Sequence, residues 1–172
     1  MILIEPTMEF DKEIQAFRQE FINAGGTMDG CGSLKSSEYT EDWIKQIELL
    51  RREETAPMGW VPSTQYIFVR EVDRKICGAI QIRHYLNEYL QQFSGHIGYS
   101  VCPSERRKGI ATRMLKEILP KCKELGIYNV KLSCVKENVG SKRVILKNGG
   151  IYERTVFEPK EQMYLEQYRI VL

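Results

Sequence analysis

The sequence predicts a single α/β domain spanning residues 1–172, with a mixed sheet that carries helices on both faces. The chain length fits one domain. Its 42% hydrophobic and 28% charged residues are ordinary for a globular protein with a buried core. Strand-like runs are interleaved with runs at helical spacing, in the order β-α-α-β-β-β-α-β-α-β-β. An interleaved order of this kind predicts helices packed on both faces of a sheet, with one β-α-β crossover.

The first elements are a short strand and two helices. "MILIEP" is predicted as a strand ended by Pro6, and a helix over residues 8–22 follows from the spacing of Phe10, Ile14, Phe17 and Phe21. The next stretch, "NAGGTMDGCGS", is rich in loop-forming residues and lacks the GK[ST] ending of a P-loop. "SSEYTEDWIKQIELLRREE" predicts a second helix with Thr40 as its cap, and "APMGWVPS" ends it.

Three strands follow, in "TQYIFVREV", "ICGAIQIRHYL" and "GHIGYSV", with a polar linker before the third. The segment from Gly109 to Leu125 is the clearest helix, and Gly126 is placed to terminate it. Pro120 lies inside this span, so we expect a kink or an early end there. "IYNVKLSCV" predicts a further strand, "NVGSKRVILKNGG" a short helix, and the remaining residues a terminal β-hairpin.

Composition and charge argue against several classes of partner. The 25 Lys and Arg residues nearly balance 23 Asp and Glu residues, with no long block of one sign, so we expect no nucleic-acid partner. The N-terminus lacks a signal-peptide pattern and no apolar stretch reaches about 18 residues, so we expect no membrane partner. The five cysteines form no CxxC pair, and no histidine lies at zinc-ligand spacing. We therefore expect neither disulfides nor a metal site, and a reducing cytoplasm is the simplest setting.

The stretch "SERRKGIATRML", residues 104–115, predicts a phosphate-binding cradle. A strand leads through a short loop into a helix, whose unpaired N–H groups and dipole suit a phosphate. Gly109 lets a ligand approach the backbone closely, Ala111 is small and Thr112 adds a hydroxyl. Positive charge flanks the site in Arg106, Arg107 and Lys108. The alternative is a solvated basic loop before an ordinary helix, and the position of the motif between strand and helix favours the cradle.

Two motifs resemble those of the GCN5-related N-acetyltransferase (GNAT) superfamily. "VCPSERRKGIATRML" resembles its Arg/Gln-x-x-Gly-x-Gly/Ala signature at Arg106, Gly109 and Ala111. A second stretch of the family, in which an Asn and a small residue open a helix ending in Lys-x-Gly, is matched at Asn138, Ser141, Lys147 and Gly149. The order of strands and helices also fits, so the resemblance spans essentially the whole chain. It implies a mixed, mostly antiparallel sheet of about six to seven strands.

The resemblance implies that the protein binds acetyl-CoA, with CoA as product and no metal. Backbone amides of residues 107–112 would hold the pyrophosphate, and the pantetheine arm would lie along the strand near Tyr99 and Cys102, in a splay between that strand and "KLSCV". Tyr99 is expected to pack, or to face the acyl group. Asn138 and Ser141 would touch the arm or the nucleotide, with a plain helix N-cap as the alternative for Asn138. The implied cofactor-binding residues are Val101, Arg106, Arg107, Lys108, Gly109, Ile110, Ala111, Thr112, Asn138 and Ser141.

Transfer to an amine calls for a base, because an ammonium has no lone pair to attack a thioester. The family often carries a Glu at the position of His96, whose unperturbed pKa suits a base at neutral pH. In a hairpin His84 would approach His96, and Glu88 in the linker is the carboxylate alternative; either histidine could instead be a strand-end residue bonded to backbone. The family's acidic tyrosine corresponds to Ile145, which leaves the proton donor for the thiolate unassigned or supplied by water. Cys134 is expected to be a buried strand residue, because direct transfer needs no nucleophile.

The predicted function is acetyl-CoA-dependent N-acetyl transfer to a primary amine of a small molecule or a peptide. The alternative is a non-catalytic acyl-CoA-binding module that acts as a sensor or binds a partner, and turnover of an amine separates the two. Walls for the acceptor are expected in loop 25–37, the helix around Trp43 and the "APMGWVPS" turn, none of which indicates a substrate. A homodimer through an exposed C-terminal strand, "QMYLEQYRIVL", is left open.

Overall fold

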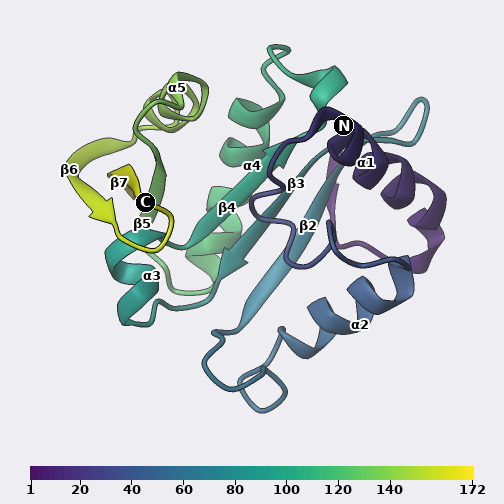
Figure 1. Cartoon of the computed structure of the whole chain (residues 1–172), viewed down its shortest axis with the longest axis horizontal. Helices are drawn as coiled ribbons and strands as arrows, with labels where there is room; N and C mark the ends of the chain where they lie inside the picture. The colour runs from purple at the N-terminus through teal and green to yellow at the C-terminus, as the bar shows by residue number, and fades with distance from the viewer.

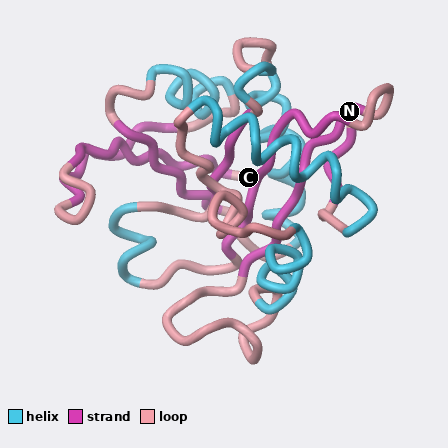
Figure 2. Tube along the Cα trace, turned by 45° about the vertical axis from the view of Figure 1, so that its right-hand side comes forward, coloured by secondary structure: helices cyan, strands magenta, loops and turns pink.

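The structure is a computed structural model that describes residues 1–172, with helices on either side of the strands (Figures 1 and 2). The strands are β1 (Ile2–Ile4), β2 (Ser63–Arg70), β3 (Lys75–Arg83), β4 (Ile97–Val101), β5 (Asn129–Val135), β6 (Ile151–Glu158) and β7 (Met163–Val171). The helices are α1 (Asp11–Ala24), α2 (Thr40–Leu49), α3 (Glu88–Phe93), α4 (Ile110–Glu124) and α5 (Val139–Lys147), with 3₁₀ turns at Met8–Phe10 and Pro103–Glu105. The predicted architecture, in which helices flank β-strands, is confirmed.

The strands form two antiparallel sheets, ordered β1-β2-β3-β4 and β5-β7-β6. The sheets meet at one place: the N–H of His96 donates to the carbonyl of Lys131 (2.8 Å), and the N–H of Lys131 donates to Nδ1 of His96 (3.0 Å). We call this pair of bonds the junction. No ladder joins β4 to β5 beyond it, and Figure 1 shows β5–β7 lying apart from β1–β4. The predicted sheet is therefore two sheets that touch at the junction and separate beyond it.

The sheet β1–β4 is covered on both faces. One cluster of buried side chains, which includes Phe68, Ile80 and Ile82, packs with α4. The other cluster, which includes Ile67 and Ala79, packs with α1 and α2. Successive side chains of a strand point to opposite faces, so burial on both faces explains why β2 and β3 are apolar almost throughout. No helix in the structure combines the length and apolarity that crossing a membrane requires.

The expected early end of α4 at Pro120 is wrong, because the helix continues to Glu124, and a kink there stays a prediction. Pro120 is exposed, and so is Lys116, whose carbonyl loses the hydrogen bond that a residue four positions later normally donates. Water can satisfy a carbonyl on the solvent side, so the proline is tolerated there.

Two further expectations about helices need correction. Thr40 is the first residue of α2 rather than its cap, and its hydroxyl accepts a hydrogen bond from Nε2 of Gln15 (2.9 Å). The linker before β4 contains a helix, α3, that the sequence did not indicate. Its N-terminus is capped by the Asn87 side chain, which accepts from the N–H of Leu90 (3.0 Å).

Candidate functional site

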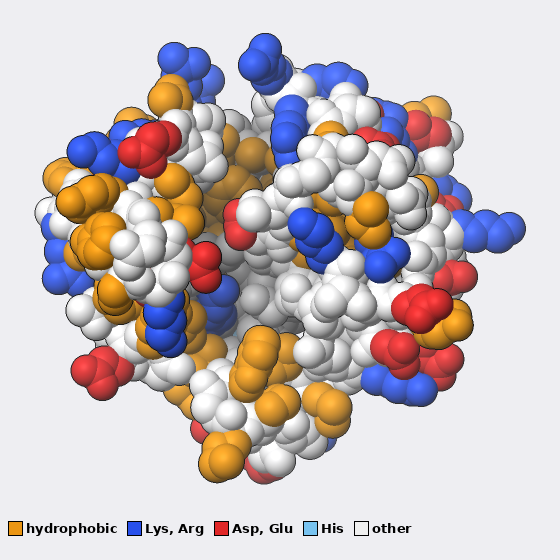
Figure 3. Space-filling model, in the orientation of Figure 1, with side chains coloured by type: hydrophobic (Ala, Val, Ile, Leu, Met, Phe, Trp, Pro, Cys, Tyr) orange, Lys and Arg blue, Asp and Glu red, His pale blue; other side chains and the backbone are white.

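The molecular surface is hollowed between the two sheets, with α5 and β5–β7 on one side and the rest of the molecule on the other (Figure 3). One wall of this hollow is the free edge of β4. The N–H of Cys102 donates to the carbonyl of Cys77 (2.9 Å), and bonding alternates along an antiparallel strand, so the backbone groups of Tyr99 and Val101 point away from β3. Because β5 does not pair with them, both N–H groups and the carbonyl of Tyr99 are available to an extended ligand, whereas the carbonyl of Val101 accepts from Nε of Arg106.

The start of α4 supplies a second set of free donors. Gly109 caps the helix with φ 78° and Arg107 has φ 63°, so two residues near the helix start adopt the left-handed region. No hydrogen bond of the chain uses a backbone N–H of residues 107–112, whereas the N–H of Arg113 donates to the carbonyl of Gly109 (3.1 Å). A Cβ built at Gly109 meets nothing within 4 Å, so the space above the helix start is open. These features fit a pyrophosphate.

Glu105 stabilises the loop that leads into α4. Its side chain is buried, and its carboxylate accepts hydrogen bonds from Arg70 (3.1 Å) and Lys108 (3.0 Å), with Lys75 at 3.7 Å. Burial alone would raise the pKa of Glu105, but the bonds from Lys108 and Arg70 hold it below its ordinary value. The carboxylate therefore stays charged and ties the loop to the turn between β2 and β3.

A second carboxylate, that of Glu20 in α1, accepts hydrogen bonds from the same loop. It accepts from the backbone N–H and the hydroxyl of Ser104 (3.3 and 2.7 Å) and from Lys75 (2.9 Å). Burial opposes ionisation, yet the bonds from Cys102, Lys75 and Ser104 lower the pKa of Glu20 to about 2. The carboxylates of Glu105 and Glu20 thus fix the loop, and the free backbone N–H groups of residues 107–112 remain available to a ligand.

The three basic residues expected around the cradle have different surroundings. Lys108 is bound to Glu105. Arg106 donates from Nε to the carbonyl of Val101 (3.3 Å), and its guanidinium lies 5.7 Å from the ring centre of Phe21. Arg107 is exposed and has no hydrogen-bond partner in the chain. The positive charge most available to an anion is therefore that of Arg107.

Tyr99 spans the gap between β4 and α5. Its hydroxyl lies 2.8 Å from Oγ of Ser141. Burial raises the pKa of Tyr99 to about 12, despite the bond to Ser141. The phenol thus keeps its proton across the physiological pH range. Tyr99 was expected to pack or to face the acyl group, and Ile145, which replaces the tyrosine of the family, is fully buried.

Asn138 caps α5, because its Oδ1 accepts from the N–H of Ser141 (3.0 Å). This is the N-cap alternative, and whether Asn138 also touches a ligand stays a prediction. Farther along the motif, Asn148 donates to the carbonyls of Thr112 (3.2 Å) and Val144 (2.8 Å), which ties the end of α5 to the first turn of α4. All five cysteines are free and buried, and burial raises the pKa of Cys134 to about 11, as a core thiol requires.

His96 belongs to the junction. Its Nδ1 accepts the N–H of Lys131, so the lone pair that a base would use is occupied. Burial, and then the charges of Lys131 and Arg83, lower the pKa of His96 to about 4. An imidazole of this kind is neutral and weakly basic near pH 7. The geometry therefore does not favour His96 as the base and gives it a structural role, and the catalytic assignment stays a prediction.

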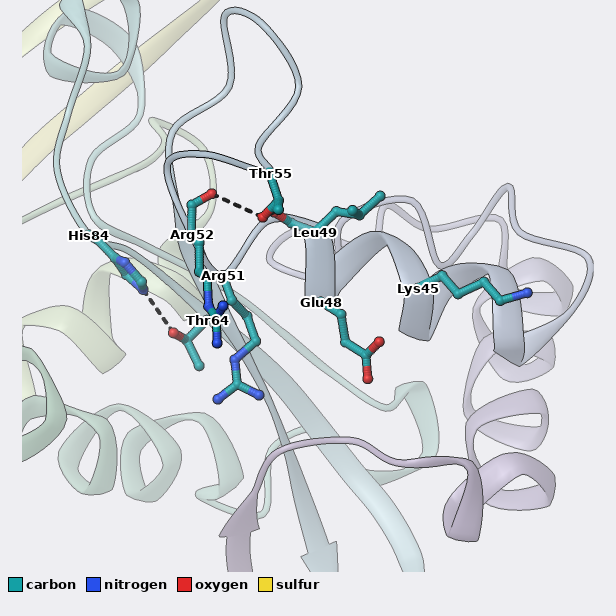
Figure 4. A pocket seen from close by; sticks show the side chains of 8 residues that line it. All are labelled: Lys45, Glu48, Leu49, Arg51, Arg52, Thr55, Thr64 and His84. Atoms are coloured by element: carbon teal, nitrogen blue, oxygen red, sulfur yellow. Dashed lines mark hydrogen bonds between the residues drawn. The ribbon is translucent and has the colours of Figure 1, made fainter.

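His84 does not approach His96 through its side chain, because it turns to a different hollow of ≈ 890 Å³ at the end of α2 (Figure 4). There its Nε2 lies 2.8 Å from the hydroxyl of Thr64. Burial and the charge of Arg51 lower the pKa of His84. Glu88 lies exposed in the first turn of α3 and has no hydrogen-bond partner. The three candidate bases are thus not gathered in one place.

The loop 25–37 closes the face of β4 opposite α4. Gly30 packs so tightly that a Cβ there would lie 2.0 Å from the carbonyl oxygen of Gly98, and Ser100 donates to the carbonyl of Asp29 (2.7 Å). Trp43, fully buried, anchors the loop from α2 by donating to the carbonyl of Cys31 (2.8 Å). This loop was one of the walls expected for an acceptor site, and it does lie against β4.

Comparison with known proteins adds to this geometry. Residues 31–149 match the family model described as "Acetyltransferase (GNAT) family". No curated protein sequence matches the chain.

Three solved structures illustrate the similarity in fold. A ribosomal-protein-S5-alanine acetyltransferase from Vibrio fischeri aligns with a TM-score of 0.74 at 13% identity, covering 98% of this chain and 91% of that one. A microcin C7 self-immunity acetyltransferase, in complex with acetyl-CoA and AMP, aligns with a TM-score of 0.71 at 17% identity. The alignment covers 99% of this chain and 91% of that one. A spermidine N-acetyltransferase from Vibrio cholerae aligns with a TM-score of 0.63 at 13% identity. The alignment covers 99% of this chain and 95% of that one. At these identities the alignments establish the fold.

Proposed function

The chain belongs to the acetyltransferase (GNAT) family, and on that premise we propose that it moves the acetyl group of acetyl-CoA directly to a primary amine of a small molecule or a peptide. The observation that carries this proposal is the row of unused N–H groups at residues 107–112, beside the free edge of β4. Neighbours in fold are named for acetylating a ribosomal protein and spermidine, which supports an amine acceptor.

The residues of the cradle fit acetyl-CoA. The N–H groups of residues 107–112 would hold the pyrophosphate, with Arg107 as the nearest free cation. The backbone of Tyr99 and Val101 would pair with the amides of the pantetheine arm, as an added strand would. When bound, acetyl-CoA supplies a thioester carbon to which the amine nitrogen bonds, while the carbon–sulfur bond breaks and its electron pair leaves with sulfur.

The junction favours a neutral amine. The charges of Lys131 and Arg83 contribute to the low pKa of His96, and they act in the same direction on any amine bound nearby. An ammonium acceptor whose pKa is lowered loses one proton to water before it attacks, and the proton that nitrogen releases as the amide forms also passes to water. We therefore infer that the surroundings of the junction replace a dedicated basic side chain, and that His96 is a positioning residue.

Tyr99 is the proton donor that we propose for the departing sulfur. Its hydroxyl lies in the gap between β4 and α5, with Ser141 as its partner. Since its pKa is raised to about 12, Oη carries a proton at neutral pH. A donated hydrogen bond at this place stabilises the negative charge that develops on sulfur.

The proposed setting is the cytoplasm, which five free cysteines support, because a reducing compartment keeps thiols unpaired. We also propose a homodimer, with a correction to the predicted surface. β7 is the central strand of its sheet, and the free edge belongs to β6. Exposed side chains of Ile151, Tyr152 and Phe157 lie along that strand.

The test is turnover. The protein is incubated with acetyl-CoA and a panel of monoamines, polyamines and peptides, and free thiol and acetylated product are both measured. We expect stoichiometric release of thiol and formation of product with at least one amine. Tight binding of acetyl-CoA without product from any amine would contradict the enzyme and favour the non-catalytic acyl-CoA-binding module.

A further inference from the structure

Glu158, the last residue of β6, has a carboxylate that is buried and only half satisfied. The residue is 2% exposed. Its Oε2 accepts the backbone N–H of Glu161 (2.5 Å), whereas Oε1 has no hydrogen-bond partner. None of the ion pairs of the chain includes Glu158. Folding gains nothing from an unpaired buried charge, since burial of a charge is costly unless a counter-charge and hydrogen bonds compensate it.

The surroundings of Glu158 suit a cation. Tyr89 of α3 lies close by, and its pKa is raised by burial, by the charges of Glu158 and Glu161, and by hydrogen bonding to the Glu158 carboxylate. The ring of Tyr89 packs on that of Phe93 (centroids 5.3 Å apart), and Nζ of Lys160 lies 4.7 Å from its centroid. The face of this ring thus already accepts an ammonium group. The carboxylates of Glu158 and Glu161 outnumber the single ammonium of Lys160, so the net charge around Tyr89 is negative.

The helix over Glu158, α3, has no buried residue, unlike the other α-helices. α3 packs against β6. It is held by hydrogen bonds to its carbonyls, from the hydroxyl of Ser133 to Phe93 (2.9 Å) and from Nε2 of Gln167 to Gln92 (2.9 Å). A short helix with few buried contacts shifts at low cost, so a ligand can pass between α3 and β6 to the carboxylate while Tyr89 stays beside it.

Chain geometry limits how far Tyr89, which lies beside this carboxylate, is from the proposed reaction site. Tyr89 and Phe93 are one helical turn apart, about 6 Å, and the three residues from Phe93 to His96 span at most about 10 Å. Tyr89 therefore lies within about 16 Å of the junction. A flexible aliphatic chain of polyamine length, or a lysine a few residues into a peptide, covers such a distance.

We propose that Glu158 and Tyr89 form a subsite for a second ammonium group of the acceptor, so that the preferred acceptor is a chain carrying at least two amines. This inference rests on the proposed function. The reacting amine lies at the junction end, and the other ammonium donates to Oε1 of Glu158 while it packs on Tyr89. The counter-charge that the folded chain lacks is thereby provided by the substrate.

The first test compares Glu158→Gln, which keeps the shape and removes the charge, with Glu161→Gln, which removes a neighbouring exposed charge. The acceptors are spermidine, butylamine, and a peptide with or without a lysine near its N-terminus. We expect Glu158→Gln to raise the KM for the dicationic acceptor at least tenfold with little change in kcat and none for butylamine. Glu161→Gln should change the KM by less than threefold. Dependence on spermidine alone, or on the lysine peptide alone, identifies the source of the ammonium.

The second test needs no turnover. Glu158→Gln should raise the Tm of the free protein, because it removes an unpaired buried charge, and should abolish the rise in Tm that spermidine causes in the wild type. Turnover of butylamine and spermidine with equal KM in both proteins would overturn the subsite and leave the proposed function intact. Absence of turnover with retained, Glu158-dependent spermidine binding would overturn the proposed function and leave the subsite.

Discussion

One side chain, that of His96, takes part in the junction between the two sheets. The Nδ1 of His96 takes the place of a backbone carbonyl opposite the N–H of Lys131, so β4 and β5 are held together where they begin and are free to diverge afterwards. The same bond removes the lone pair that made His96 attractive as a base.

The low pKa of His96 predicts how stability depends on pH. The pKa is about 4 in the folded chain and 6.5 ordinarily, so between these values the unfolded chain binds more protons and stability falls as the pH is lowered. We expect the urea midpoint to decrease from pH 6.5 to pH 4.5 and the decrease to become smaller in His96→Gln. His84→Gln serves as the control for a second histidine with a lowered pKa. An unchanged pH dependence in His96→Gln would contradict the structural role.

Tyr99 predicts a loss of rate without loss of binding. Tyr99→Phe keeps the ring and removes the hydroxyl that faces Ser141, so kcat should fall on the order of 10²-fold while CoA affinity stays within about twofold. Steady-state kinetics and calorimetry measure the two quantities. Because the pKa of Tyr99 is about 12, the wild-type rate should show no inflection from loss of this proton below pH 10. A Tyr99→Phe enzyme with full kcat would remove Tyr99 from the mechanism.

The sequence indicated geometry that is set locally and did not indicate contacts that depend on how the strands pair. Gly109 could be assigned from its neighbours alone, because a strand, a loop and a helix follow one another there. His96 and His84 could not, because their roles depend on which strand stands opposite and which way the ring turns. Glu158 gave no signal at all, since its burial arises only when α3 covers the tip of the β6–β7 hairpin.

At the scale of elements, the loop before α4 is held from beneath by carboxylates. Glu105 is the central one, and it binds cations from the β2–β3 region and from the loop itself. Lys108, one of the basic residues of the motif, therefore stabilises the loop, a role that spacing alone does not reveal.

Glu105→Gln should weaken both the fold and the cradle. Loss of the charged hydrogen bonds to Arg70 and Lys108 should lower the free energy of unfolding by about 1–3 kcal/mol and reduce CoA affinity several-fold, as measured by urea unfolding and calorimetry. The matched control is Glu117→Gln, which breaks the exposed pair with Arg113 on α4 and should cost about 0.5 kcal/mol or less. Equal effects of the two substitutions would show that Glu105 has no special role in the loop.

At the scale of the whole molecule, the order of elements was predictable and the division into two sheets was not. Strand patterns and turn residues mark each element, but the break between β4 and β5 depends on backbone groups that stop pairing after the junction. Only the family resemblance anticipated the splay. That residues 1–172 form one domain stays a prediction.

The free edge of β6 predicts self-association. An edge strand with exposed aromatic side chains is a template for pairing with a second copy, and β6 is exposed along most of its length. Light scattering should give twice the chain mass of 20.1 kDa. Phe157→Lys, which places a charge on an exposed residue of this strand, should give the mass of one chain. A monomeric wild type at micromolar concentration would contradict the dimer.

The central claim is that the start of α4 holds a pyrophosphate, and calorimetric titration tests it most directly. CoA and pantetheine, which lacks the pyrophosphate and nucleotide, are titrated into the wild type, Gly109→Asp and Gly109→Asn. The two substitutions have the same shape, and the space at Gly109 is open; Asn and Asp both tolerate the left-handed φ. We expect micromolar binding of CoA, much weaker binding of pantetheine, and at least tenfold weaker CoA binding by Gly109→Asp than by Gly109→Asn. Equal CoA affinity in these two variants, or no CoA binding by the wild type, would contradict the cradle.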